Sequence, residues 1–344
     1  MAKKHWFRFG IILFLTFIFL YFFFRSVKDW DKVLASLTAV RIPFFALSVV
    51  LVPLHLFTRG YRWKYLLIHE KPDVRVYNLF AANAVGFTVN LIFPGRLGEL
   101  VKPLYLAKKE NLRKGFCLGT VVVERTFDIF TMCALLGMFM IARPLFVKIL
   151  PVDPETASNL TKWGILGVAF ASVLLVVTLG LYFFKNPTLR IIRAVLSPLP
   201  GRWSAKILEL IDEFIEGLKF FRSPANMLMY TLMSFVVWLG IVSYYWIFFL
   251  AYKQNVPFFF MIPYCFLVMV GASIPTPGMV GGYHYFSQVG MASVLHLDPN
   301  LAVSMTIVVH AIQLVVTCLV GYVILGKEGL SLFQLKKLGE SEAP

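Results

Sequence analysis

Three ionisable residues stand together inside an apolar stretch of the sequence. Glu124, Arg125 and Asp128 occur in "VVVERTFDIF", and no other charged residue lies between positions 116 and 141. On a helix, Arg125 can pair with Asp128 three residues further on, while Glu124 and Asp128 share a face. Each charge at the centre of a membrane helix costs about 2.5 to 3.5 kcal/mol, and such residues usually mark transport pathways. We therefore expect a polar site or relay that faces a cavity. The alternative is an ion network that only locks helices together.

A second candidate site lies in "NLIFPGRLGE", residues 90 to 99, where a Pro-Gly pair interrupts an apolar run. A broken helix frees backbone amides at the start of its second half, and such helix starts attract anions. The adjacent arginine supplies a planar fork that suits phosphate. The alternative is an interfacial arginine that reaches lipid phosphates. The candidate binding residues here are Pro94, Gly95, Arg96, Gly98 and Glu99.

The Pro-Gly-x-[Leu/Val]-Gly pattern returns in "SIPTPGMVGG", residues 273 to 282. This second phrase carries no charge, but its prolines and glycines allow a sharp break and a close approach of the backbone to a ligand. At a nearly matching distance after each break, Glu124 and His310 occupy corresponding positions in a weak internal echo. The candidate binding residues of this half are Pro275, Pro277, Gly278, Gly281, Gly282 and His310.

The composition indicates that membrane helices must position these residues. The chain has 344 residues, 59% hydrophobic and 15% charged, with a mean hydropathy of +0.76. These values are typical of a polytopic membrane protein. In such a protein the net charge of +15 marks cytoplasmic loops rather than a nucleic-acid partner. The sequence contains no nucleotide-binding, zinc-protease or serine-hydrolase motif, and its four cysteines lack metal spacing. We therefore expect no catalytic residue, cofactor or metal.

About six segments are long and apolar enough to cross a membrane. The first lacks the small-residue cleavage site of a signal peptide, so we expect it to remain as a span. The six segments are 6–24, 43–58, 116–141, 163–184, 227–251 and 301–325.

Two shorter apolar runs, 78–93 and 258–274, end at the two Pro-Gly phrases. If the first run crossed the membrane, the basic segment 102–114, which contains Lys102, would lie outside, against the positive-inside rule. A re-entrant hairpin resolves the conflict, and the same count makes 258–295 a hairpin from the opposite side. We therefore predict an all-α membrane protein in which two opposed re-entrant hairpins meet as an inverted repeat. Arg59 and Arg62 are expected to anchor the second span at the cytoplasmic surface, and both termini should be cytoplasmic.

The connection 187–222 contains apolar residues at helical spacing, with acidic residues on the other face. This pattern predicts an amphipathic helix at the cytoplasmic membrane interface, or alternatively a helical linker that packs on the cytoplasmic loops. We expect one transmembrane domain, 1–326, followed by a short cytoplasmic tail, 327–344.

The motifs "RGYRW", "NLIFPGRLGE", "ERTFD" and "SIPTPGMVGG", in this order, resemble the transmembrane region of the lysylphosphatidylglycerol synthase family, whose members are flippase-like membrane proteins. The resemblance implies movement of a lipid between leaflets, with an anionic or polyprenyl-linked lipid as the substrate of a stand-alone member in the cell membrane. About 18 residues follow the final span, so we expect no synthase domain and no enzymatic activity. The alternatives are a membrane-embedded lipid-modifying transferase and a scaffold for envelope enzymes, and self-association is left open. The resemblance departs at His310, where an arginine would be expected.

Overall fold

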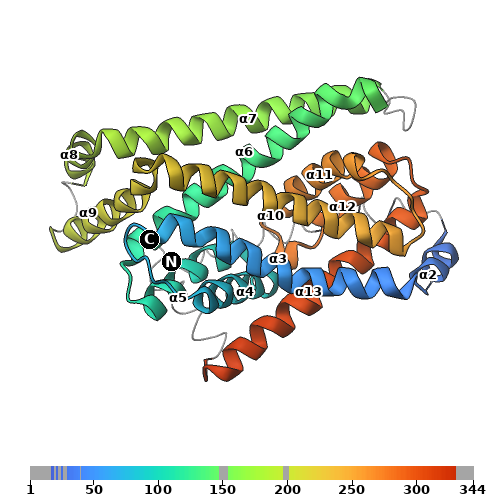
Figure 1. Ribbon diagram of the computed structural model, residues 1–344, viewed down its shortest axis with the longest axis horizontal. Coiled ribbons are helices and arrows are strands. Elements are labelled where there is room, and N and C mark those ends of the chain that lie inside the picture. Colours follow the sequence, from blue (N-terminus) through green and yellow to red (C-terminus); the bar gives the residue numbers. More distant parts are fainter. Residues whose placement is uncertain are drawn as a thin grey trace.

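The computed structural model describes residues 29–38, 40–146, 154–196 and 201–330, together with Phe17, Ile18, Tyr21 and Arg25. Helices are the only regular secondary structure in these described ranges. Several of the long helices run roughly along the long axis of the molecule, and others cross it obliquely (Figure 1). The predicted all-α class is therefore confirmed.

Four described helices are long and apolar enough to cross a membrane: α3 (Ile42–Leu67), α6 (Lys114–Phe146), α10 (Pro224–Ala251) and α13 (Pro299–Lys327). A fifth candidate is the last part of α7 (Pro154–Phe183) with α8 (Lys185–Val195), which are bent by 96° against each other. The predicted span 6–24 lies almost entirely outside the described residues. The polytopic character is thus confirmed, whereas the prediction of six full spans stays a prediction.

The first Pro-Gly phrase forms the tip of a helical hairpin. Helix α4 (Val76–Ile92) is followed by a short turn, Pro94–Arg96, and by α5 (Gly98–Glu110), which packs back on α4. Gly95 turns the chain with a φ of 78°, a conformation that glycine adopts without strain. A Cβ at Gly98 would lie only 1.9 Å from the carbonyl oxygen of Gly86, so this position requires glycine. The predicted break therefore lies where the sequence placed it.

The second phrase forms a matching tip. Helix α11 (Met261–Ser273) leads through the turn Pro277–Met279 into α12 (Gly282–Val289), which is extended by one π-helical turn, Gly290–Val294. This hairpin lies toward the end of the molecule that carries α2 (Trp30–Thr38), whereas α4 and α5 lie toward the opposite end (Figure 1).

The two tips contact each other. A Cβ at Gly278, in the second tip, would lie 3.1 Å from the carbonyl oxygen of Leu91, at the end of α4. The Nη1 of Arg96 donates to the carbonyl oxygen of Ser273 at 3.4 Å. The two broken elements, far apart in the sequence, therefore form one central structure, as the repeated phrase predicts.

The predicted amphipathic connection contains α8, α9 (Gly201–Glu216) and a 3₁₀ segment, Gly217–Arg222. Helix α9 packs closely on α6, because a Cβ at Gly119 would lie 2.4 Å from the carbonyl oxygen of Phe214. Ile215 and Leu218 are buried. The apolar face of α9 therefore packs on protein, which favours the alternative of a linker helix packed on the rest of the chain.

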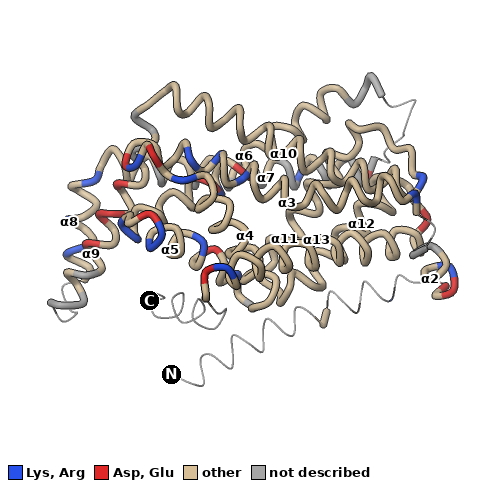
Figure 2. Tube along the Cα trace, turned by 60° about the horizontal axis from the view of Figure 1, so that its bottom comes forward, with Lys and Arg blue, Asp and Glu red and all other residues tan. Residues whose placement is uncertain are grey.

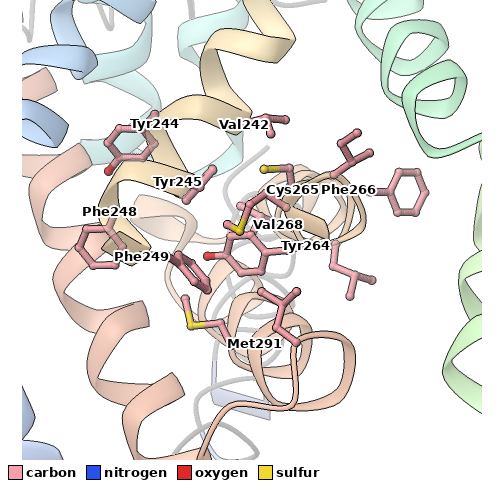
Figure 3. Packing of buried hydrophobic residues seen from close by; sticks show 14 of the residues in the cluster. Val242, Tyr244, Tyr245, Phe248, Phe249, Tyr264, Cys265, Phe266, Val268 and Met291 are labelled. Atoms are coloured by element: carbon pink, nitrogen blue, oxygen red, sulfur yellow. The ribbon is translucent and has the colours of Figure 1, made fainter. Parts of the chain in front are cut away.

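Charge and apolar packing are separated along the molecule. Charged residues gather around α5, α8 and α9 and at α2, while α11 and α12 are almost free of them (Figure 2). The larger hydrophobic core joins α10, α11 and the π-helical turn through aromatic rings such as Tyr245 and Tyr264, whose centroids are 5.2 Å apart (Figure 3). The exceptional charges are those buried between α3, α5 and α6.

Candidate functional site

A cavity of about 410 Å³ lies where the two hairpin tips meet the long helices. Its wall comes from α3, α4, α6, α10, α11, α12 and α13 and from both tips. The volume is within the range of roughly 300 to 1,000 Å³ that is typical of small-molecule sites. Asp128 lines this cavity together with three arginines, Arg59, Arg96 and Arg125. The remaining wall is mainly apolar and aromatic, with hydroxyl and amide groups on the side of α10, α12 and α13.

Asp128 is the centre of a buried ion network. Its Oδ1 accepts hydrogen bonds from Nη1 of Arg62 at 2.7 Å and from the indole of Trp238 at 3.1 Å. Its Oδ2 accepts from Arg59 at 3.3 Å and from Arg125 at 3.1 Å. The predicted pair between Arg125 and Asp128 is present. Four donors from three helices occupy this carboxylate, so it joins α3, α6 and α10.

Glu124 forms the second node of the network and is completely buried. Its Oε2 accepts a short hydrogen bond from Nζ of Lys102, on α5. Its Oε1 lies 3.4 Å from Nη2 of Arg62 and 3.7 Å from Nη1 of Arg59. Lys102 also lies over the ring of Trp63, 4.4 Å from the centroid. Glu124 therefore links the first hairpin to α3 and α6.

The positions of Arg59, Arg62 and Lys102 correct the sequence-based interpretation. The exposed fraction is 5% for Arg59 and 0% for Arg62, so neither is an interfacial anchor. Lys102 is 2% exposed and lies inside a helix rather than in a cytoplasmic loop. The positive-inside rule counts basic residues along the sequence and takes no account of buried carboxylates that could pair with them in the fold. The motif "RGYRW" carries the one sequence signal for this role, because it places Arg59 and Arg62 one turn apart on the same face of a helix.

Arg96 is held loosely beside this network. It has a positive φ of 55°, and its side chain is 34% exposed. Its guanidinium makes only the 3.4 Å contact with the carbonyl oxygen of Ser273 and a 3.8 Å ion pair with Glu99 among the described residues. Glu99 is shared, since its other oxygen lies 3.1 Å from Nε of Arg125. Most donors of the Arg96 guanidinium therefore remain available.

One backbone amide at the start of α5 is already satisfied. The amide of Gly98 donates to Oδ1 of Asn90 at 2.7 Å. This bond corrects the expectation that the whole broken helix start is free for an anion. The guanidinium of Arg96, rather than the amide of Gly98, is therefore the hydrogen-bond donor with which this tip can bind an anion.

The ionised cluster carries more positive than negative charge. Its cations outnumber its carboxylates by two among the described residues, and a surplus of charge in an apolar interior is costly unless an anion or water compensates it. The cations are Arg59, Arg62, Arg96, Lys102 and Arg125, and the carboxylates are Glu99, Glu124 and Asp128. The arrangement is therefore suited to receiving an anion.

The predicted residues of the second phrase shape the tip rather than line the cavity, whose wall at this tip is formed by Ser273, Met279 and Tyr283. Positive φ values of 60° at Gly278 and 94° at Gly281 turn the chain. Gly282 allows close packing, because a Cβ there would lie 2.6 Å from the carbonyl oxygen of Gly271. Pro275 is exposed, and Pro277 begins the 3₁₀ turn.

His310 does not correspond to Glu124 in the structure. Its ring stacks on Tyr283 with a centroid distance of 4.6 Å and meets His284 edge-on at 4.7 Å. Its buried Nε2 has no hydrogen-bond partner among the described residues. His310 lies outside the ion network. The weak internal repeat therefore does not give His310 the role that Glu124 has in the first half. No group of three potential metal ligands occurs in the described residues.

Comparisons with known proteins identify the family of this chain. A UPF0104 membrane protein of Methanocaldococcus jannaschii is 21% identical over 323 residues, which cover 91% of this chain and 93% of that protein. No solved structure matches. The family model described as the lysylphosphatidylglycerol synthase TM region matches residues 6–321. The chain that builds this charged cavity from two hairpin tips therefore belongs to the lysylphosphatidylglycerol synthase TM region family.

Proposed function

We propose that this protein moves lipids with an anionic headgroup between the two leaflets of the cell membrane and leaves their covalent structure unchanged. The observation that carries the proposal is the surplus of two positive charges around a cavity where the two hairpin tips meet. A phosphate that crosses hydrocarbon without partners pays a large desolvation cost. Fixed guanidinium donors replace the lost hydration and reduce that cost.

In this mechanism Arg96 and Arg59 hold the headgroup, because both keep unused donors. Arg59 donates through Nε to His55 at 2.8 Å and through Nη1 to Asp128, while its Nη2 has no hydrogen-bond partner among the described residues. Each nitrogen of Arg125 lies within 3.5 Å of a carboxylate oxygen, and its Nε is buried without a hydrogen-bond partner among the described residues, so Arg125 acts by keeping the network in place. The acyl chains stay in the lipid during transfer.

The carboxylates limit how tightly the headgroup is held. Glu99 lies within ion-pair distance of both Arg96 and Arg125. When a phosphate leaves, Glu99 can take its place beside Arg96, so the guanidinium is never left without an anion. This exchange suits a translocator, which must release its substrate as readily as it binds it.

The test uses the purified full chain in vesicles that contain phosphatidylglycerol with a fluorescent acyl chain, whose outer-leaflet fraction is measured by dithionite quenching. Arg96→Ala should slow transfer roughly 10- to 150-fold, the equivalent of a charge-assisted hydrogen bond of about 1.5 to 3 kcal/mol. Arg96→Lys should be impaired, because it keeps the charge and loses the fork. Arg113→Ala is the matched control, since Arg113 pairs with Glu70 at 2.9 Å away from the cavity.

Two results would contradict the proposal. Full transfer by Arg96→Ala would return Arg96 to the role of an interfacial residue. A covalently altered lipid in mass spectra of the same vesicles would favour a membrane-embedded transferase instead.

A further inference from the structure

The cavity has a second wall that the ion network does not use. Besides the arginines, Tyr245 of α10, Tyr283 of α12 and Gln313 of α13 line the same space. Nε2 of Gln313 donates to the hydroxyl of Tyr245 at 3.0 Å, and this hydroxyl is hydrogen-bonded to that of Tyr283 at 3.1 Å. We refer to these three residues as the hydroxyl-amide wall.

The hydroxyl-amide wall leaves one donor and one acceptor unused. The two tyrosine hydroxyls carry one proton each, and the bond between them uses only one of the two. The other proton has no acceptor among the described residues. The Oε1 of Gln313, a residue of the cavity wall, likewise accepts no hydrogen bond from them. A free donor beside a free acceptor matches a hydroxyl group, which both donates and accepts.

A positively charged headgroup would find no unoccupied carboxylate in the cavity wall formed by the described residues. Asp128 is the one carboxylate in the cavity wall formed by the described residues. Each of its oxygens already accepts two hydrogen bonds, and the donors are three arginines and Trp238. An ammonium group would therefore meet a surplus of cations, which disfavours it by like-charge repulsion.

We infer that the cavity selects anionic lipids whose headgroup carries hydroxyl groups, such as a phosphodiester of glycerol, inositol or a sugar. The phosphate lies against Arg96 and Arg59, and the hydroxyl groups bind the hydroxyl-amide wall. Aminoacylated and other ammonium-bearing headgroups are poor substrates. This inference rests on the proposed function, since it names the lipids that the same cavity moves.

The experiment compares three lipids with identical labelled acyl chains in vesicles that contain the purified full chain. Phosphatidylglycerol and phosphatidylmethanol carry the same charge, but only the first has headgroup hydroxyls. Lysylphosphatidylglycerol adds ammonium groups. Phosphatidylglycerol should cross at least fivefold faster than the other two, the equivalent of about one hydrogen bond.

Variants then test whether the hydroxyl-amide wall causes the preference for phosphatidylglycerol. Gln313→Leu removes the unused acceptor and should bring the ratio of the phosphatidylglycerol rate to the phosphatidylmethanol rate close to one. Tyr283→Phe removes one of the two hydroxyls but leaves the proton of Tyr245 free, so it should lower this ratio only in part. Tyr264→Phe is the matched control, because its hydroxyl bonds to Ser287 at 3.0 Å and lies outside the cavity wall. It should keep the ratio of the unaltered protein. Size-exclusion chromatography identifies a variant that fails to fold. Tyr283→Phe removes only one oxygen atom, so this variant is expected to fold even if Gln313→Leu does not.

The outcomes separate the inference from the proposed function. Equal rates for phosphatidylglycerol and phosphatidylmethanol, both reduced by Arg96→Ala, would overturn the inference and leave the proposed function standing. Fastest transfer of lysylphosphatidylglycerol, or an unchanged ratio in both wall variants, would also overturn the inference. If none of the three lipids crosses faster than in empty vesicles, the proposed function fails and the inference fails with it.

Discussion

Asp128→Asn should strongly destabilise the protein, because it removes the charge that holds two buried arginines, Arg59 and Arg62, and the partly exposed Arg125. Asparagine keeps the shape of the side chain, so the change isolates the charge. The positive surplus of the cluster rises from two to three, and Arg62, which is 0% exposed, loses its closest carboxylate contact. Loss of one partner from a buried ion pair typically costs about 3 to 5 kcal/mol, because the other charge is left uncompensated. We expect a loss of that size in the free energy of unfolding.

The assay is a double-mutant cycle with Arg62→Met, followed by SDS unfolding and tryptophan fluorescence. Trp238 donates directly to Asp128, and it is one of the seven tryptophans whose summed emission follows the unfolding. The double variant restores the original surplus of two, and it should be at least about 1 kcal/mol more stable than Asp128→Asn alone. Asp31→Asn, an exposed change on α2, is the control and should stay within about 0.5 kcal/mol.

A loss below about 1 kcal/mol for Asp128→Asn would refute this reasoning, because the buried Arg62 would keep a single carboxylate contact, at 3.4 Å with Glu124, which Lys102 also neutralises. Strict additivity in the cycle would refute it as well. In either case water inside the cavity would already screen the charges, and the surplus would no longer argue for an anionic substrate.

Two further predictions concern the first hairpin. Gly98→Ala should destabilise the protein by about 1 to 3 kcal/mol or more in the same SDS titration, because the new Cβ would lie 1.9 Å from the carbonyl oxygen of Gly86. Its matched control, Gly137→Ala, places a Cβ in open space on α6 and should be neutral or stabilising by up to about 1 kcal/mol. At the end of α5, burial raises the pKa of Glu110, but hydrogen bonds from Lys71 and Asn78 outweigh it and hold the pKa below the ordinary value. A lowered pKa stabilises the fold at neutral pH, and this contribution disappears as the pH falls through the ordinary carboxyl range and then through the lowered pKa. The difference in thermal stability between the unaltered protein and Glu110→Gln should therefore be largest near pH 7 and vanish in acid. A difference that grows on acidification would contradict this assignment.

The sequence predicted the hairpin tips because their chemistry is local. Pro94 and Gly95 cannot continue an apolar helix, and the same holds for Pro277 and Gly278. The charges of α6 were also recognisable, since Glu124 and Asp128 stand in an otherwise apolar run. Both signals depend only on neighbours in the chain, and the structure places both where they were expected.

The partners of those charges could not be predicted in the same way. Arg59 and Arg62 lie 66 to 69 residues before Asp128, and Lys102 lies 22 residues before Glu124. Each of these basic residues also fits the positive-inside rule, and the rule wrongly placed them at the cytoplasmic surface of the membrane. The hydroxyl-amide wall was missed for a related reason. Tyr245, Tyr283 and Gln313 are ordinary residues of apolar helices, and only the fold brings their polar ends to one cavity.

The long sequence separation within the ion network has a consequence for biosynthesis. At roughly 5 to 20 residues per second, Asp128 leaves the ribosome about 3 to 13 s after Arg62, which is 66 residues earlier. Trp238, 110 residues after Asp128, follows about 6 to 22 s later. During the first delay, two arginines without a counter-charge cannot settle at their final depth in hydrocarbon. We therefore expect the end of α3 to stay at the membrane surface until α6 inserts and supplies the carboxylates that pair with its arginines.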